Sequence, residues 1–141
     1  MTENEKRCIE QALRFLDIRE HNRSELKTKL NNKGYEDEVC ESALDFLTDE
    51  GSLDEERYIR SFIRSNNRRH PEGKVILAQR LAQKGADRNL SKQVLNEVYT
   101  EEYTAEITRL AVEKLEKKGK AEDPQVLRAS LYKLGLSDKY L

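Results

Sequence analysis

A pattern that occurs three times at nearly equal intervals constrains this chain more than any other feature. Each copy has leucine at positions i and i+4 and glycine four residues later, and the three glycines are 51 and 50 residues apart. Leucines four residues apart share a helix face, and glycine is a common helix terminator. The copies are Leu26, Leu30 and Gly34, then Leu77, Leu81 and Gly85, then Leu127, Leu131 and Gly135. A repeat of this length predicts a tandem array, and arrays usually bind long partners along one face.

The fold class that we expect is all-α, an elongated tandem array of three three-helix, helix-turn-helix-like repeats. Apolar residues recur at helical spacing, and no segment shows the apolar–polar alternation of a strand. The repeats are expected at residues 1–53, 54–100 and 101–141, the third with a shortened last helix. Units of this size have marginal cores when alone, so neighbouring repeats are expected to support one another.

Local start and stop signals predict where the helices lie. The expected helices cover residues 5–19, 22–34, 36–49, 54–67, 71–85, 87–99, 103–118 and 124–135. Asn22 with Glu25 three residues later is typical of a capping box, and Asp54 is a good N-cap. Pro71 is expected in the first turn of its helix, where proline is tolerated.

Charge is distributed unevenly along a chain whose formal net charge is only −1. Residues 1–53 carry a net charge of −5, residues 54–100 carry +4, and residues 101–141 are neutral. A basic module within a near-neutral chain indicates a local anionic partner. The alternative interpretation, that these cations only solvate a helix surface, stays open for each arginine taken singly.

The candidate binding surface lies in this basic middle repeat. Four arginines spaced by 3, 4 and 4 residues form one stripe of the helix expected at 54–67, away from its apolar face. The candidate partner- or DNA-binding residues are Arg57, Arg60, Arg64, Arg68, Arg69, Lys74, Arg80 and Lys84.

Sequence motifs for catalysis or cofactor binding do not occur. There is no glycine-rich phosphate loop, nucleophile motif or His-Glu-x-x-His pair, so we expect no enzyme, cofactor or metal site. Cys8 and Cys40 are expected as reduced thiols on helix faces, and His21 as a packing or capping residue. No apolar run approaches the roughly 18 residues of a membrane span, and the N-terminus has no signal-peptide pattern, so a cytoplasmic location is expected.

Two stretches are more specific than generic helices. Residues 19–26 read Arg-Glu-His-Asn-Arg-Ser-Glu-Leu, with Lys-Gly-Tyr at 33–35, and residues 51–57 read Gly-Ser-Leu-Asp-Glu-Glu-Arg before an apolar, aromatic helix. Together they resemble the RecX family of recombination regulators. Asn22 stands where that family commonly has serine, and Glu55 where it commonly has aspartate.

The resemblance implies a non-enzymatic modulator of the RecA recombinase. Relatives bind the RecA–DNA filament within its helical groove and limit its activity, and some contact DNA directly. We therefore expect a monomer that inhibits RecA and makes weak nonspecific DNA contacts. We expect no association with a membrane. The loop at 66–76 departs from the family pattern through Pro71 and Glu72, and the third repeat lacks a full last helix.

Two other functions remain open on sequence alone. One is a helix-turn-helix DNA-binding protein that acts independently of RecA and reads bases from a recognition helix. Such a protein prefers one duplex sequence over others, whereas a filament modulator does not. The second is a helical adaptor for some other protein. A RecA binding assay would distinguish such an adaptor from a RecA modulator.

Overall fold

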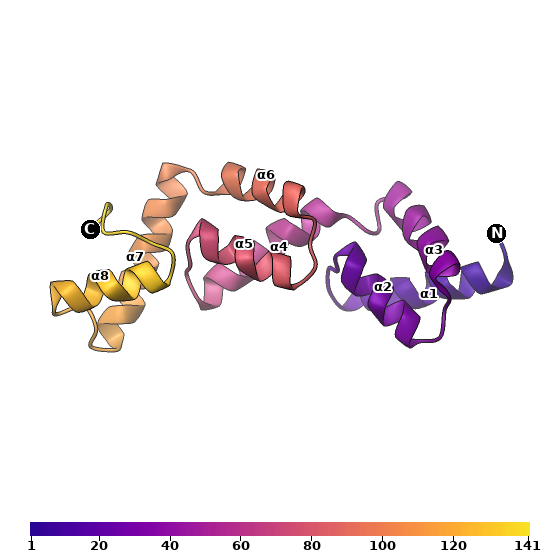
Figure 1. Ribbon diagram of the computed structural model, residues 1–141, viewed down its shortest axis with the longest axis horizontal. Helices are drawn as coiled ribbons and strands as arrows, with labels where there is room; N and C mark the ends of the chain where they lie inside the picture. Colours follow the sequence, from indigo (N-terminus) through magenta and orange to yellow (C-terminus); the bar gives the residue numbers. More distant parts are fainter.

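The computed structural model describes residues 1–141 as eight helices without a strand, set out in a row from one end of the molecule to the other (Figure 1). This confirms the all-helical array. The helices are α1 (Glu3–Ile18), α2 (Arg23–Asn32), α3 (Asp37–Asp49), α4 (Glu55–Arg69), α5 (Lys74–Gln83), α6 (Arg88–Val98), α7 (Glu101–Lys117) and α8 (Pro124–Lys133).

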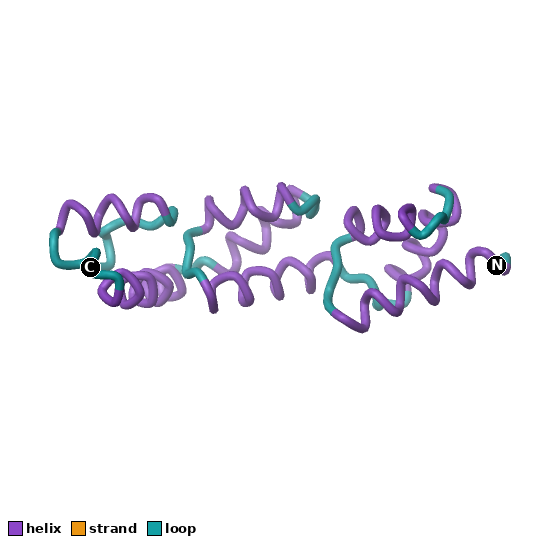
Figure 2. Tube along the Cα trace, turned by 90° about the horizontal axis from the view of Figure 1, so that it is seen from below, coloured by secondary structure: helices purple, strands orange, loops and turns teal.

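Three separate apolar cores divide the row into three units, which Figure 2 shows side by side from below. Helices α1–α3 enclose the first core, α4–α6 the second, and α7 with α8 the third. The extensively packed helix pairs all lie within one unit. Each repeat thus supplies its own hydrophobic stabilisation, and separate contacts must fix the repeats relative to one another.

The repeated leucines and glycines occupy equivalent places. Both leucines of the first two copies and Leu131 are fully buried. Gly34, Gly85 and Gly135 all have positive φ angles, between 74° and 97°, as expected for glycine after a helix. Leu127 differs because it is only partly buried in its core. The shortened last helix expected for the third repeat is not formed: residues 134–141 after α8 form turns, so no counterpart of α3 and α6 lies over this leucine.

The predicted caps are correct, but the prediction for Pro71 is wrong. Asn22 and Glu25 form the complete capping box, and Asp54 caps α4. However, α5 begins at Lys74 with Gly73 as its N-cap, and Pro71 lies in a buried loop before it. The reason is tertiary, because the loop's backbone N–H groups bond to side-chain and main-chain oxygens outside the helix.

Candidate partner-binding surface

The middle repeat is held against the first repeat by polar contacts, which we call the first joint. Arg57 Nε on α4 donates to Glu20 Oε1 across 2.8 Å. The Glu55 carboxylate accepts from the backbone N–H of Arg23 and of Asp87, each at 2.9 Å, and so ties the starts of α2 and α6 together. Carboxylates are favourable at helix N-termini, where N–H groups lack partners within the helix.

Asn22 and His21 stand behind this joint and are buried. The Asn22 amide donates to the carbonyl of Lys84 at the end of α5, across 3.0 Å. His21 Nδ1 lies 3.0 Å from the Arg19 carbonyl, and its Nε2 lies 2.8 Å from Lys29 Nζ. Burial lowers the pKa of His21, so the ring is neutral, donates from Nδ1 and accepts at Nε2. These contacts give His21 the structural role expected for it.

The middle and third repeats meet at a second joint, which is built differently. The backbone N–H of Gly73 donates to the Leu134 carbonyl across 2.7 Å. A methyl group added at Gly73 would lie 2.0 Å from the carbonyl oxygen of Gly135, so the two backbones touch. The side chain of Lys114 on α7 also donates to the carbonyl of Arg69.

A buried hydrogen-bond network completes the second joint. Asn67 donates from its amide nitrogen to the hydroxyls of Tyr99 and Tyr103, both at 2.9 Å. Its amide oxygen accepts from the N–H of Glu72 at 3.1 Å, and the Tyr99 hydroxyl donates to the carbonyl of Glu72 at 2.6 Å. The loop containing Pro71 is thereby fixed by residues of α4 and by the segment between α6 and α7.

Glu72 is the buried carboxylate of this loop. Arg80 donates to both of its oxygens, at 2.8 and 2.6 Å, and Asn66 donates at 2.8 Å. Burial alone would raise the pKa of Glu72, but the hydrogen bonds from Arg80 and Asn66 outweigh it and leave the pKa lowered. The Glu72 carboxylate is therefore ionised, and it holds the loop to Asn66 and Arg80 within the middle repeat.

Three of the eight predicted binding residues are already engaged within the chain. Arg57 bonds to Glu20 and to two carbonyls of the α3–α4 turn, and Arg80 to Glu72. Arg60 pairs with Glu56 on its own helix and with Glu97 on α6. Each pair cancels much of the charge that these arginines offer to a partner.

The other five predicted residues make no ion pair within the chain and are exposed. They are Arg64, Arg68, Arg69, Lys74 and Lys84. The first three lie on the C-terminal half of α4, and we call them the basic stripe. Lys74 donates to Asn96 at 3.0 Å, and Lys84 is the C-cap of α5. The structure thus separates the candidates into three arginines that are engaged within the chain and five cations that have no acidic partner.

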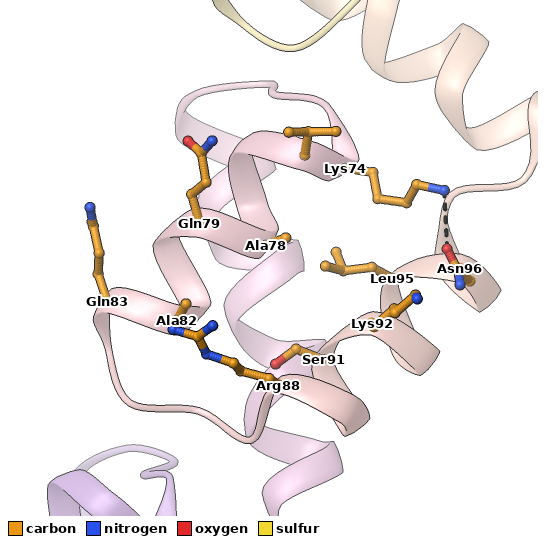
Figure 3. Close-up of a pocket in the computed structure, with 11 residues that line it drawn as sticks. Lys74, Ala78, Gln79, Ala82, Gln83, Arg88, Ser91, Lys92, Leu95 and Asn96 are labelled. Atoms are coloured by element: carbon orange, nitrogen blue, oxygen red, sulfur yellow. Dashed lines mark hydrogen bonds between the residues drawn. The ribbon is translucent and has the colours of Figure 1, made fainter.

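Two further cations were missed by the sequence prediction. Arg88 and Lys92 on α6 lie with Lys74 around a groove between α5 and α6 (Figure 3). Neither makes an ion pair within the chain. Their i,i+4 spacing in a segment poor in carboxylates is the signal that could have identified them.

Potential metal ligands do not cluster in the structure. No three His, Cys, Asp or Glu side chains lie close enough together to hold a metal ion. Cys8 and Cys40 are both buried, and burial raises the pKa of the Cys8 thiol to about 12, which keeps it protonated. None of the eight helices has both the length and the apolar composition needed to cross a membrane.

The fold and this surface define a class: a tandem array of small helical repeats with a basic middle unit. Comparison with protein-family models is more specific. Residues 8–47 match the model described as the first three-helix domain of RecX, and residues 54–95 match the model of its second three-helix domain. The two matches cover more than half of the chain, which therefore belongs to the RecX family of regulatory proteins.

Curated relatives of the same family are similar over part of their length. The regulatory protein RecX of Chlorobium limicola is 41% identical over 63 residues, which are 45% of this chain and 40% of that protein. The RecX of Pseudomonas fluorescens strain SBW25 is 52% identical over 52 residues, 37% of this chain and 34% of its own. The similarity thus spans less than half of either relative.

A solved structure shares the fold across the whole chain. The crystal structure of RecX from Lactobacillus salivarius superposes with a TM-score of 0.82, covering 99% of this chain and 93% of that one. Sequence identity is only 20%, so this similarity supports the arrangement of helices.

Proposed function

We propose that this protein binds the RecA–DNA filament and inhibits the recombinase activities that depend on it, without chemistry of its own. Membership of a family of regulatory proteins supports this proposal most directly. The elongated row of repeats suits a partner that extends over several subunits (Figure 2). We place the protein in the cytoplasm, as a monomer.

The basic stripe is the part of the surface that we assign to this contact. Arg64, Arg68 and Arg69 are exposed, lie close together on α4, and have no carboxylate partner in the chain. Exposed arginines without partners attract phosphates or acidic protein surfaces and speed association at low salt. Arg57, Arg60 and Arg80 belong to the proposal only as supporting residues, since their guanidinium groups are engaged.

The decisive experiment measures ATP hydrolysis by RecA on single-stranded DNA, with and without this protein. The expected result is inhibition that saturates with added protein. The variant Arg64→Glu, Arg68→Glu, Arg69→Glu should lose most of this inhibition while keeping its helicity and melting temperature. If hydrolysis and strand exchange are unchanged by the unmodified protein, the proposal is wrong.

The salt dependence of DNA binding identifies what the stripe contacts. If the arginines contact phosphates, each lost contact should reduce the slope of log K against log salt by about one. A strong preference for one duplex sequence would favour the helix-turn-helix DNA-binding alternative, which acts independently of RecA. Equal weak binding to all sequences agrees with the filament proposal.

A further inference from the structure

The groove between α5 and α6 combines an apolar surface with positively charged residues. It has a volume of about 690 Å³ and is lined by eleven residues, among which there is no carboxylate. The positive charge of its lining lysines and arginine is therefore not offset by any acid on its walls. Figure 3 shows its two walls, with α5 on one side and α6 on the other.

The floor and one wall of the groove are apolar. Val75 on α5 is 62% exposed, although it is a branched aliphatic residue. Ala78 and Ala82 are exposed on the same helix, at i+3 and i+7 from Val75, and Leu95 of α6 is buried beneath them. Small residues at this spacing let another backbone approach α5 closely.

Cations mark the edges of the groove. Arg88 and Lys92 stand one helical turn apart on α6, about 6 Å along its axis. Lys74 stands at the start of α5, with its ammonium group held by Asn96 (Figure 3). None of the three is neutralised by an acidic side chain, so the rim attracts negative charge next to an apolar floor.

Ser91 gives a second and independent observation. Its side chain lies between the two helices in Figure 3, and the residue is only 4% exposed. Its hydroxyl oxygen is buried and has no hydrogen-bond partner within the chain. A buried hydroxyl without a partner is costly, and a polar group delivered into the groove would satisfy it.

We propose that this groove docks an acidic amphipathic helix of a partner protein. Aliphatic side chains of the partner helix would pack on Val75, Ala78 and Ala82. Carboxylates at positions i and i+4 of the same helix would pair with Arg88 and Lys92. Helix-in-groove recognition uses this combination of an apolar stripe and flanking charges. Nucleic acid fits less well, because no aromatic residue lines the groove for base stacking.

The proposal is independent of RecA and is tested with a peptide. The probe is a fluorescein-labelled helix of about 16 residues with glutamates at i and i+4 beside leucines, compared with the same peptide carrying lysines. Saturable binding of the acidic peptide is expected. Shifts of the Ala78 and Ala82 methyl resonances on titration should locate it in the groove.

Charge reversal with a matched control tests whether binding of the acidic peptide depends on the cations of the groove. Arg88→Glu with Lys92→Glu should weaken binding of the acidic peptide about tenfold or more and strengthen binding of the lysine peptide. The control, Arg7→Glu with Arg14→Glu, changes the net charge equally at exposed positions of α1, outside both proposed surfaces, and should leave affinity nearly unchanged. Ala78→Gln should weaken binding sterically without altering charge.

Several results would overturn the proposal. These are no binding of the acidic peptide, equal losses in the two double variants, or unshifted Ala78 and Ala82 resonances. Displacement of the peptide by a single-stranded oligonucleotide that itself needs Arg88 and Lys92 would assign the groove to nucleic acid instead. Because the RecA assay uses variants of the basic stripe, failure of either proposal leaves the other intact.

Discussion

The two joints connect the same kind of repeat by different combinations of contacts. At the first joint, charged side chains cross from one repeat to the other, as with Arg57 and Glu20, and these two are 45% and 30% exposed. At the second joint, backbone touches backbone at Gly73 and Gly135, beside a buried network of neutral groups around Asn67.

This difference indicates unequal stiffness along the array. The partly exposed Arg57–Glu20 ion pair contributes little and weakens with salt, which leaves the first joint to the hydrogen bonds of Asn22 and Glu55. At the second joint, close backbone packing adds to buried hydrogen bonds and resists displacement. We therefore expect repeats 2 and 3 to move as one body and repeat 1 to move against them.

The largest effect is expected from Gly73→Ala. Because φ at Gly73 is −79°, alanine is tolerated by the local backbone, and the penalty comes from the clash with Gly135. We expect a loss of about 1–3 kcal/mol, or more if the repeats separate. Thermal unfolding measures the loss, and small-angle scattering should show a longer or more variable molecule.

Gly34→Ala is the matched control, since Gly34 has a φ angle of 97° and open space around it. It should cost on the order of 1 kcal/mol through backbone strain alone, with no change in shape. A Gly73→Ala protein with an unchanged scattering profile and melting curve would remove the argument for a rigid second joint.

The next effect is expected from Asn67→Ala. This change leaves the N–H of Glu72 and the hydroxyl of Tyr103 without their partner and removes the N–H group that donates to the Tyr99 hydroxyl, which should cost about 1–3 kcal/mol. Denaturant unfolding at low salt and near 1 M salt should give the same loss, because the groups are neutral. Asn89→Ala, at an exposed position of α6, is the control and should be nearly silent.

A smaller and pH-dependent effect is expected at Glu72. Its pKa is lowered from an ordinary value near 4.5, so its ionisation stabilises the fold above that pH and loses this contribution as the pH falls below it. Glu72→Gln should be less stable at neutral pH and show a shallower decline in acid. Unfolding curves from pH 6 downward test this, with Glu38→Gln, an exposed carboxylate, as control. Parallel acid limbs for Glu72→Gln and the unmodified protein would contradict it.

The smallest effect is expected at the first joint. A double-mutant cycle of Arg57→Ala and Glu20→Ala should give a coupling of about 0.2–1 kcal/mol at low salt, fading near 1 M salt. The control cycle uses Arg109 and Glu106, which pair within α7 and cross no joint. A coupling that persists at high salt would show that the first joint, like the second, is insensitive to salt, and would contradict the difference proposed between them.

Local signals in the sequence predicted most helices and their caps. The contacts between repeats and the start of α5 depend on residues far apart in the sequence. The caps at Asn22 and Asp54 and the three glycine helix ends involve neighbours in the chain, so pattern alone finds them. Asn22 bonds to Lys84, 62 residues away, and no local rule predicts such a contact. The start of α5 was misplaced for the same reason.

The same division applies to the candidate surface. The spacing of the arginines on α4 correctly separated them from the buried face, because helical periodicity decides that. It could not show that Arg57 is engaged by Glu20 or Arg80 by Glu72. The RecX-like stretches at 19–26 and 51–57 both contribute to the first joint, so residues that carry the resemblance also bond the first two repeats together.

The main-chain hydrogen bond from Gly73 to Leu134 has a consequence for the entropy of association. Ordering a flexible junction on binding costs conformational freedom that the contacts must offset. A partner that touches only repeats 2 and 3 meets a surface that is ordered beforehand. A partner that extends from α1 to α8 has to immobilise only one of the two junctions, so its affinity depends on the orientations that repeat 1 samples.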